Sequence, residues 1–206
     1  MKRILFSVHL VVAAAMLAGI GHTRAEDGVD SAKTAAFDKR IFAGPPRRKS
    51  YACFVRGYDA NHLTQRPKQK VSAMKLLVTA ENAREEKTTS HSFRLGIKYR
   101  HRTGNFDSSG FCGHVVTEDA SNEIRFDCGV DCEGGGINVA LSKDDKSTII
   151  RLERIRTWNR NKPDQEAEDA LVAGADDRLF RVDRAGAEEC AELVTDRREL
   201  AAIRHK

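Results

Sequence analysis

Residues 123–136 of this chain read EIRFDCGVDCEGGG, and the first eleven of them alternate between charged or glycine residues and apolar or cysteine residues. This is the period of a β-strand with one buried face, and it points Cys128 and Cys132 inward together. The alternation resumes after the three glycines with the opposite parity. Because a straight strand cannot change parity, we expect a bulge, a bend or a tight turn at the glycines. The apolar positions beyond them are Ile137, Val139 and Leu141.

The same alternation recurs along most of the chain and predicts further strands. The segments that carry it are 74–78, 92–100, 111–117, 147–158 and 179–183. Turn-forming residues separate them at 104–105, 143–146 and 174–177. Helical spacing is confined to residues 31–42, one turn at 59–65, and residues 187–203. We therefore predict a mainly β protein, an antiparallel sandwich or small barrel with short helical segments near the termini and disulfide bonds.

The first 25 residues have the pattern of a secretory signal peptide. Lys2 and Arg3 precede an apolar run, and the run is followed by Thr-Arg-Ala ending at Ala25. Its uninterrupted apolar part, residues 10–20, is about half of the roughly 20 residues that a membrane-spanning helix needs. We expect cleavage after Ala25, no membrane span in the mature chain, and a periplasmic or secreted location.

The remainder is expected to form one domain. The predicted organisation is a flexible lead-in over 26–50, a β domain over 51–193, and a basic C-terminal tail over 194–206 that frays. The whole chain has 35 basic and 30 acidic residues, and the signal removes three basic ones, so the mature net charge is about +2. Acids interrupt the basic runs and few aromatic residues accompany them, so we expect no nucleic-acid partner.

Five cysteines lie beyond the signal, and export makes disulfides their expected fate. If Cys128 and Cys132 share a strand, four residues separate them, which is too far for a bond between the two. Cys112 is then the nearest candidate partner for one of them. A bridge between Cys53 and Cys190 would fasten the two ends of the domain. The sequence leaves the arrangement open, with one cysteine left over.

The sequence contains no established catalytic or metal-binding motif. The histidines are scattered, and the cysteine pair lacks the second short-spaced pair of a structural zinc site. There is no Gly-x-Ser-x-Gly elbow for a serine nucleophile. We therefore expect no enzyme activity, no metal and no cofactor.

One polar cluster merits inspection: Asp59, His62 and His114. The simpler interpretation of Asp59 and His62 is a turn whose side chains cap backbone groups. His114 is in phase with Cys112 in a strand pattern, where a single histidine is usually a satisfied core or rim residue. The more specific interpretation is that the three residues act together.

Three segments, 58–63, 128–136 and 174–183, together resemble a group of small exported proteins of alphaproteobacteria. The cysteine-glycine segment is the most specific part of the resemblance, which covers most of residues 51–190. The resemblance implies a periplasmic location and carries over no activity, ligand or catalytic residue.

These observations favour a non-enzymatic binding or envelope-associated β module. Its expected partner is a small apolar ligand or an envelope protein, held in a pocket lined by inward residues such as Phe93, Leu95 and Ile97. The alternative function is a metal-binding protein or a hydrolase-type enzyme that uses His62, Asp59 and His114.

Overall fold

The chain folds into a single antiparallel sheet, described by a computed structural model over residues 29–83, 88–117, 122–131, 133–162 and 169–204. Within these ranges the sheet has nine strands: β1 (Lys49–Gly57), β2 (Val71–Ala83), β3 (Thr88–Tyr99), β4 (Phe106–Val116), β5 (Ile124–Gly129), β6 (Gly135–Leu141), β7 (Ser147–Asn159), β8 (Asp169–Val172) and β9 (Leu179–Ala185). Two disulfides join Cys53 to Cys190 and Cys112 to Cys128. The predicted mainly β, disulfide-bonded fold class is confirmed.

The sheet closes on itself. Strand β7 pairs with β6 on one side and β9 on the other, and β9 also pairs with β1. The pairings therefore run from β1 to β7 in chain order and return through β9 to β1, while β8 pairs with β7 outside this ring. Of the two predicted architectures, the structure has the small barrel.

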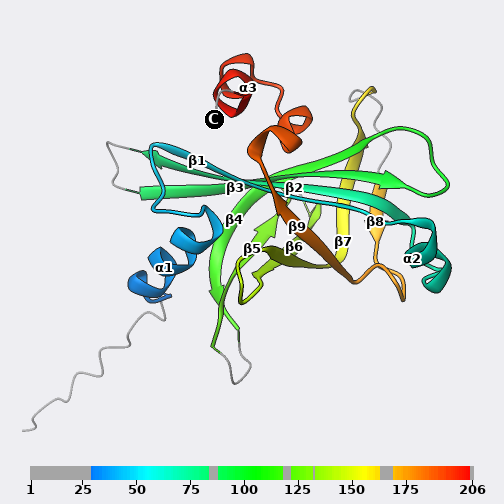
Figure 1. The fold of residues 1–206 in the computed structure, drawn as a ribbon, viewed down its shortest axis with the longest axis horizontal. Helices are drawn as coiled ribbons and strands as arrows, with labels where there is room; N and C mark the ends of the chain where they lie inside the picture. The colour runs from blue at the N-terminus through cyan, green and yellow to red at the C-terminus, as the bar shows by residue number, and fades with distance from the viewer. Residues whose placement is uncertain (1–28, 84–87, 118–121, 132, 163–168, 205–206) are drawn as a thin grey trace, which may run out of the picture.

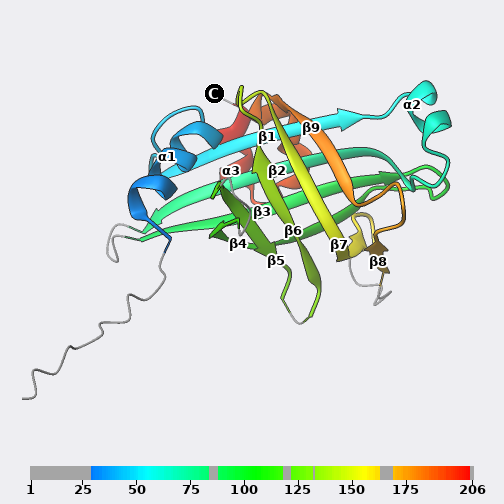
Figure 2. The same ribbon diagram turned by 90° about the horizontal axis from the view of Figure 1, so that it is seen from below.

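In the part of the chain that the structure describes, four short helical segments accompany the sheet: α1 (Ser31–Ile41), α2 (Ala60–Gln65), the 3₁₀ helix η1 (Ala187–Leu193) and α3 (Arg197–Arg204). In Figures 1 and 2, α1 and α2 lie at opposite ends of the sheet. Figure 1 also places α3 beside the outer face, over β1, β2 and β3. We call the two ends of the sheet the α1 end and the α2 end.

Two hydrophobic clusters lie on opposite faces of the strands. The larger cluster fills the inside of the closed sheet and includes Phe37 and Ile41 of α1. The smaller lies outside, where Cys53 and Leu77 pack against residues of η1 and α3. Phe93, Leu95 and Ile97 belong to the inner cluster and are at most 2% exposed. Side chains therefore fill the space where the sequence predicted a pocket for an apolar ligand.

The described residues of the segment 123–136 include β5, a loop after it and the start of β6. Phe126 and Cys128 face inward as predicted, and the hydrogen bond from Val130 N to Gly135 O closes the loop at 2.9 Å. Gly135 has a φ of +74°, and a register shift follows it in the pairing of β6 with β7. The change of parity is thus a tight turn followed by a bulge, both of which glycine accommodates.

The structure differs from the predicted organisation at both margins. The described part of residues 26–50 includes α1, whose Phe37 and Ile41 are buried, so it is part of the core and not a flexible lead-in. Residues 194–204 also pack, with Val194 and Ile203 buried against the outer face. Strands β1 and β8 were not predicted.

Two predictions concern residues outside the described ranges, namely the signal peptide over 1–25 and Cys132. Within those ranges, no helix has the length and apolar character required to cross a membrane.

Candidate functional site

The candidate site begins with α1, which brings an aspartate to the α1 end of the sheet. The Asp30 side chain caps the helix by accepting hydrogen bonds from Ala32 N at 2.8 Å and Lys33 N at 3.3 Å. Three residues of the helix are buried: Phe37, Asp38 and Ile41. Because Phe37 and Ile41 enter the inner core, the intervening carboxylate is drawn inside as well.

Two histidines meet this carboxylate from neighbouring strands. His91 lies on β3 in phase with the inward Phe93, and His114 lies on β4 in phase with the inward Cys112. Register brings their strands together, because His91 pairs with Cys112, two residues before His114. The two imidazole centroids are 4.8 Å apart.

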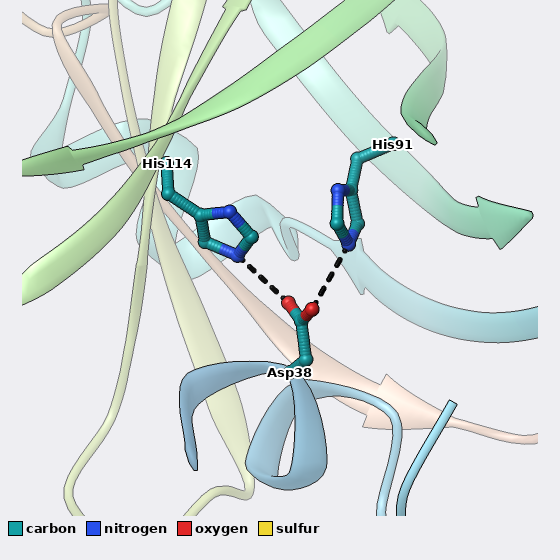
Figure 3. Close-up of side chains that lie close together, drawn as sticks. All are labelled: Asp38, His91 and His114. Carbon is teal, nitrogen blue, oxygen red and sulfur yellow. Dashed lines mark hydrogen bonds and ion pairs between the residues drawn. The ribbon is translucent and has the colours of Figure 1, made fainter. Parts of the chain in front are cut away.

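The three side chains converge on the carboxylate (Figure 3). His114 Nε2 lies 2.8 Å from Asp38 Oδ1, and His91 Nε2 lies 3.1 Å from Asp38 Oδ2. Each imidazole therefore bonds a different oxygen. The exposed fractions of the three side chains are 5% for His91, 10% for Asp38 and 14% for His114. The cluster is nearly closed to water but not sealed.

Aromatic rings pack around the cluster of Asp38, His91 and His114. The Phe126 centroid lies 5.0 Å from that of His91 and 4.8 Å from that of His114. Phe37 meets Phe126 edge to face at 5.0 Å, and Phe42 stacks on His91 at 6.2 Å. These contacts restrict the orientations of both imidazoles, so their Nε2 atoms stay directed at the carboxylate.

Two opposing effects act on the pKa of Asp38. Burial raises it, whereas hydrogen bonds and charge from His114 and His91 lower it, and the net result lies below the ordinary value of 3.8. The carboxylate is therefore ionised at neutral pH, which is the form that binds a cation.

Two imidazoles and one carboxylate are ligands that first-row transition metals accept. The three ligand atoms lie within 4.8 Å of one another. Bonds of about 2.1 Å at tetrahedral angles would place such atoms about 3.4 Å apart. Around an ion the most distant ligand atoms would therefore close by about 1.4 Å, while the two N···O contacts of 2.8 and 3.1 Å would lengthen.

The structure separates the polar cluster that the sequence suggested. Asp59 caps α2 by accepting a hydrogen bond from His62 N at 2.8 Å, which confirms the capping interpretation. His62 Nε2 lies 2.9 Å from Gln69 Oε1. His114, by contrast, belongs to the α1 end with Asp38. A hydrolase-type site made of His62, Asp59 and His114 is therefore not assembled.

Sequence reasoning missed Asp38 and His91. A signal for His91 was present, because it lies two residues before Phe93 in the same alternation, so a polar side chain was directed into the core. Asp38 had no comparable signal. Its burial depends on how α1 lies across the sheet, which the helical spacing alone does not specify.

Comparisons with protein-family models, with curated proteins and with solved structures found no match to this chain.

Proposed function

We propose that this protein is an exported binding module whose site at the α1 end takes one divalent transition-metal ion, with Zn²⁺ as the best-fitting choice. The observation that carries the proposal is the convergence of Asp38, His91 and His114, whose ligand atoms lie within 4.8 Å of one another. They come from one helix and two strands.

The donor set favours zinc over the harder cations. Imidazole nitrogen suits Zn²⁺, copper and iron, whereas Ca²⁺ and Mg²⁺ prefer sites made of oxygen. Three protein ligands leave one position of a tetrahedral ion for water or an exogenous ligand. Of the three side chains, that of His114 is the most exposed to solvent, at 14%.

Export is part of the same proposal. The sequence pattern of residues 1–25 predicts a signal peptide, and two disulfides are what an oxidising compartment maintains. The resemblance to exported alphaproteobacterial proteins favours the periplasm. The metal would then bind outside the cytoplasm, after the disulfides have formed.

Titration of chelator-treated protein tests the metal site. Isothermal titration calorimetry should give one Zn²⁺ per chain, and the absorption spectrum of the Co²⁺ form should report a four- or five-coordinate ion. We expect His91→Gln and His114→Gln each to weaken Zn²⁺ binding at least 100-fold, because each removes one of three ligands.

His62→Gln is the matched control, since it makes the same substitution at the α2 end, where His62 contacts Gln69 instead of the cluster. This variant should bind Zn²⁺ like the parent protein. Equal loss in all three variants, or no binding by the parent protein, would contradict the proposal. In the second case Asp38 and the two histidines would serve only as a buried ionic contact that fastens α1.

A further inference from the structure

A second feature lies on the outer face of the sheet, where β5, β6 and β7 run side by side (Figure 2). A hollow of about 360 Å³ opens there, at the register shift between β6 and β7. Among its described lining residues two are acidic and two are basic, namely Asp127, Glu153, Arg151 and Arg154. Such a lining favours neither an anion nor a cation.

Two of these charged side chains have unused hydrogen-bonding groups. Arg151 and Glu153 lie on the exposed side of β7, before and after the buried Leu152. Neither side chain forms a hydrogen bond or an ion pair within the described part of the chain. A guanidinium offers only donors and a carboxylate only acceptors, so together they offer both to a ligand.

A row of polar side chains crosses the three strands beside the hollow. Register places Asp127 of β5, Asn138 of β6 and Arg151 of β7 next to one another. Asn138 Nδ2 donates a hydrogen bond to Asp127 Oδ1, which orients both side chains. Asp127 Oδ2 and Asn138 Oδ1 accept no hydrogen bond from the described residues, so the row adds two acceptors to the donors of Arg151.

The neighbouring row has almost no side chains. Phe111 of β4 pairs with Gly129 of β5, which pairs with Gly136 of β6. A Cβ atom at Gly136 would collide with Cys128 O, so packing requires glycine there, whereas a Cβ atom at Gly129 would meet no atom within 4 Å. The φ of Gly129 also lies outside the left-handed region. A strand glycine that neither packing nor conformation requires is typical of a place where a ligand approaches the backbone.

An exposed aromatic ring closes one end of this row. Phe111 is 65% exposed, more than any other large hydrophobic residue in the described ranges. It lies two strand spacings from Gly136, which is about 10 Å. We call the row from Phe111 to Gly136, together with the adjoining hollow, the trough. It has the length of two sugar rings, with carbon surface at one end and hydrogen-bonding groups along one side.

We infer that the trough binds an uncharged oligosaccharide of at least two sugar rings. Each sugar hydroxyl both donates and accepts, which matches a lining that offers acceptors and donors. Arg151, Glu153 and Asp127 bond the hydroxyls, and the C–H face of one ring lies over Gly129 against Phe111. The trough shares no residue with the metal site and does not depend on it.

Two-dimensional ¹H–¹⁵N spectra of the disulfide-bonded protein test the inference, with cellobiose, maltose and N,N′-diacetylchitobiose as neutral probes. At least one should shift the amide signals of residues 111–113, 127–129, 136–138 and 151–154. Glucose has a single ring and should bind at least tenfold more weakly. Digalacturonate and the diamine chitobiose are charged dimers and should bind no more tightly than the best neutral probe. The tetramer of that probe binds more tightly if the ligand is a polysaccharide, and equally if it is a free disaccharide.

Filling the floor of the trough gives the sharpest variant. Gly129→Val places a side chain where no protein atom lies, so the fold should be retained, but the valine occupies the position of the ligand. Binding should weaken at least tenfold. Gly57→Val is the matched control, because a Cβ atom at Gly57 also meets no atom within 4 Å and this glycine ends β1, away from the trough.

Two further substitutions locate the contacts. Phe111→Ala and Arg151→Gln should each weaken binding about tenfold, whereas Val172→Ala and Arg48→Gln, at exposed residues outside the trough, should not. The inference is overturned if no neutral disaccharide shifts the named signals, if glucose binds as well as the disaccharides, if a charged dimer binds more tightly than all three, or if the control variants cause equal losses.

Discussion

The two ends of the closed sheet use the same residue types in opposite ways. At the α1 end Asp38 is buried and binds two histidines that are 53 and 76 residues distant in sequence. At the α2 end Asp59 and His62 are three residues apart, and the aspartate binds a backbone amide. Neighbours in sequence thus serve local structure, whereas the side chains that converge on one another come from distant segments.

The burial of the two helices explains this difference. Helix α1 places Phe37, Asp38 and Ile41 in the core, whereas α2 has no buried residue. A carboxylate that is removed from water requires charged or hydrogen-bonding partners, and an exposed one does not. Burial at the α1 end therefore accounts for the gathering of Asp38, His91 and His114.

The largest effects should come from the disulfides, which differ in position relative to the α1 end. They close 137 and 16 residues respectively, so in the chain-entropy model replacing Cys53 and Cys190 by serine costs about 5 kcal/mol and replacing Cys112 and Cys128 about 3 kcal/mol. Only the replacement of Cys112 and Cys128 should also weaken Zn²⁺ binding, because Cys112 lies opposite the ligand His91 in the pairing of β3 with β4. Urea denaturation and calorimetry measure the two effects. A loss of Zn²⁺ affinity only when Cys53 and Cys190 are replaced would contradict this prediction, because that disulfide lies on the outer face of the sheet.

Substituting the two aspartates compares the ends directly. Asp38→Ala should lower the free energy of unfolding by about 3–5 kcal/mol without metal, because it leaves two imidazoles without their buried partner. Asp59→Ala, the matched control, should cost about 1 kcal/mol through loss of a helix cap. Both values come from urea denaturation in the presence of a chelator. Similar losses in the two variants would remove the contrast between the ends.

The pH dependence of stability should have opposite signs at the two ends. The pKa of Asp38 is below 3.8, so its contribution is complete above pH 3.8 and is lost as the pH falls through the folded-state pKa. Burial raises the pKa of Asp177 above 3.8, against hydrogen bonds from backbone amides. Its contribution is complete below pH 3.8 and is lost as the pH rises through the folded-state pKa.

Removing each carboxyl group separates these contributions. Asp38→Asn should make the free energy of unfolding less dependent on pH below pH 3.8. Asp177→Asn should make it less dependent on pH above pH 3.8. Each tenfold change in proton affinity corresponds to about 1.4 kcal/mol. Urea denaturation between pH 2.5 and 7 provides the measurement. If Asp38→Asn lost stability more steeply than the parent protein as the pH falls, the predicted contribution of Asp38 would have the wrong sign.

The smallest effect concerns local opening of the helices. Amide protons of α2, such as those of Leu63 and Arg66, should exchange with solvent much faster than that of Phe42 at the end of α1, since α2 buries no side chain. Asp59→Ala should accelerate exchange in α2 alone. Slow exchange throughout α2 would show that it is held as firmly as α1.

Much of the fold was predictable because alternation is a local property. The segments around Phe93 and Phe126 form strands whose inward residues match the predicted faces. Cys112 with Cys128, and Cys53 with Cys190, were open candidates. The register of β4 with β5 brings the first pair together, and the packing of η1 on the outer face brings Cys190 to Cys53. The site itself was not predicted, since Asp38 and His91 become part of a cluster only through contacts between segments that are distant in sequence.

The sequence by itself determined the strand faces, the turns at the glycines and the class of the fold, because side-chain direction follows from the two-residue period of a strand. The tertiary structure decided that the sheet closes through β7 and β9, and that α1 lies against the inner cluster. Both depend on which distant segments pair, and pairing is set by the total burial of the assembled chain. For that reason Asp38 meets His91 and His114 only in the folded protein.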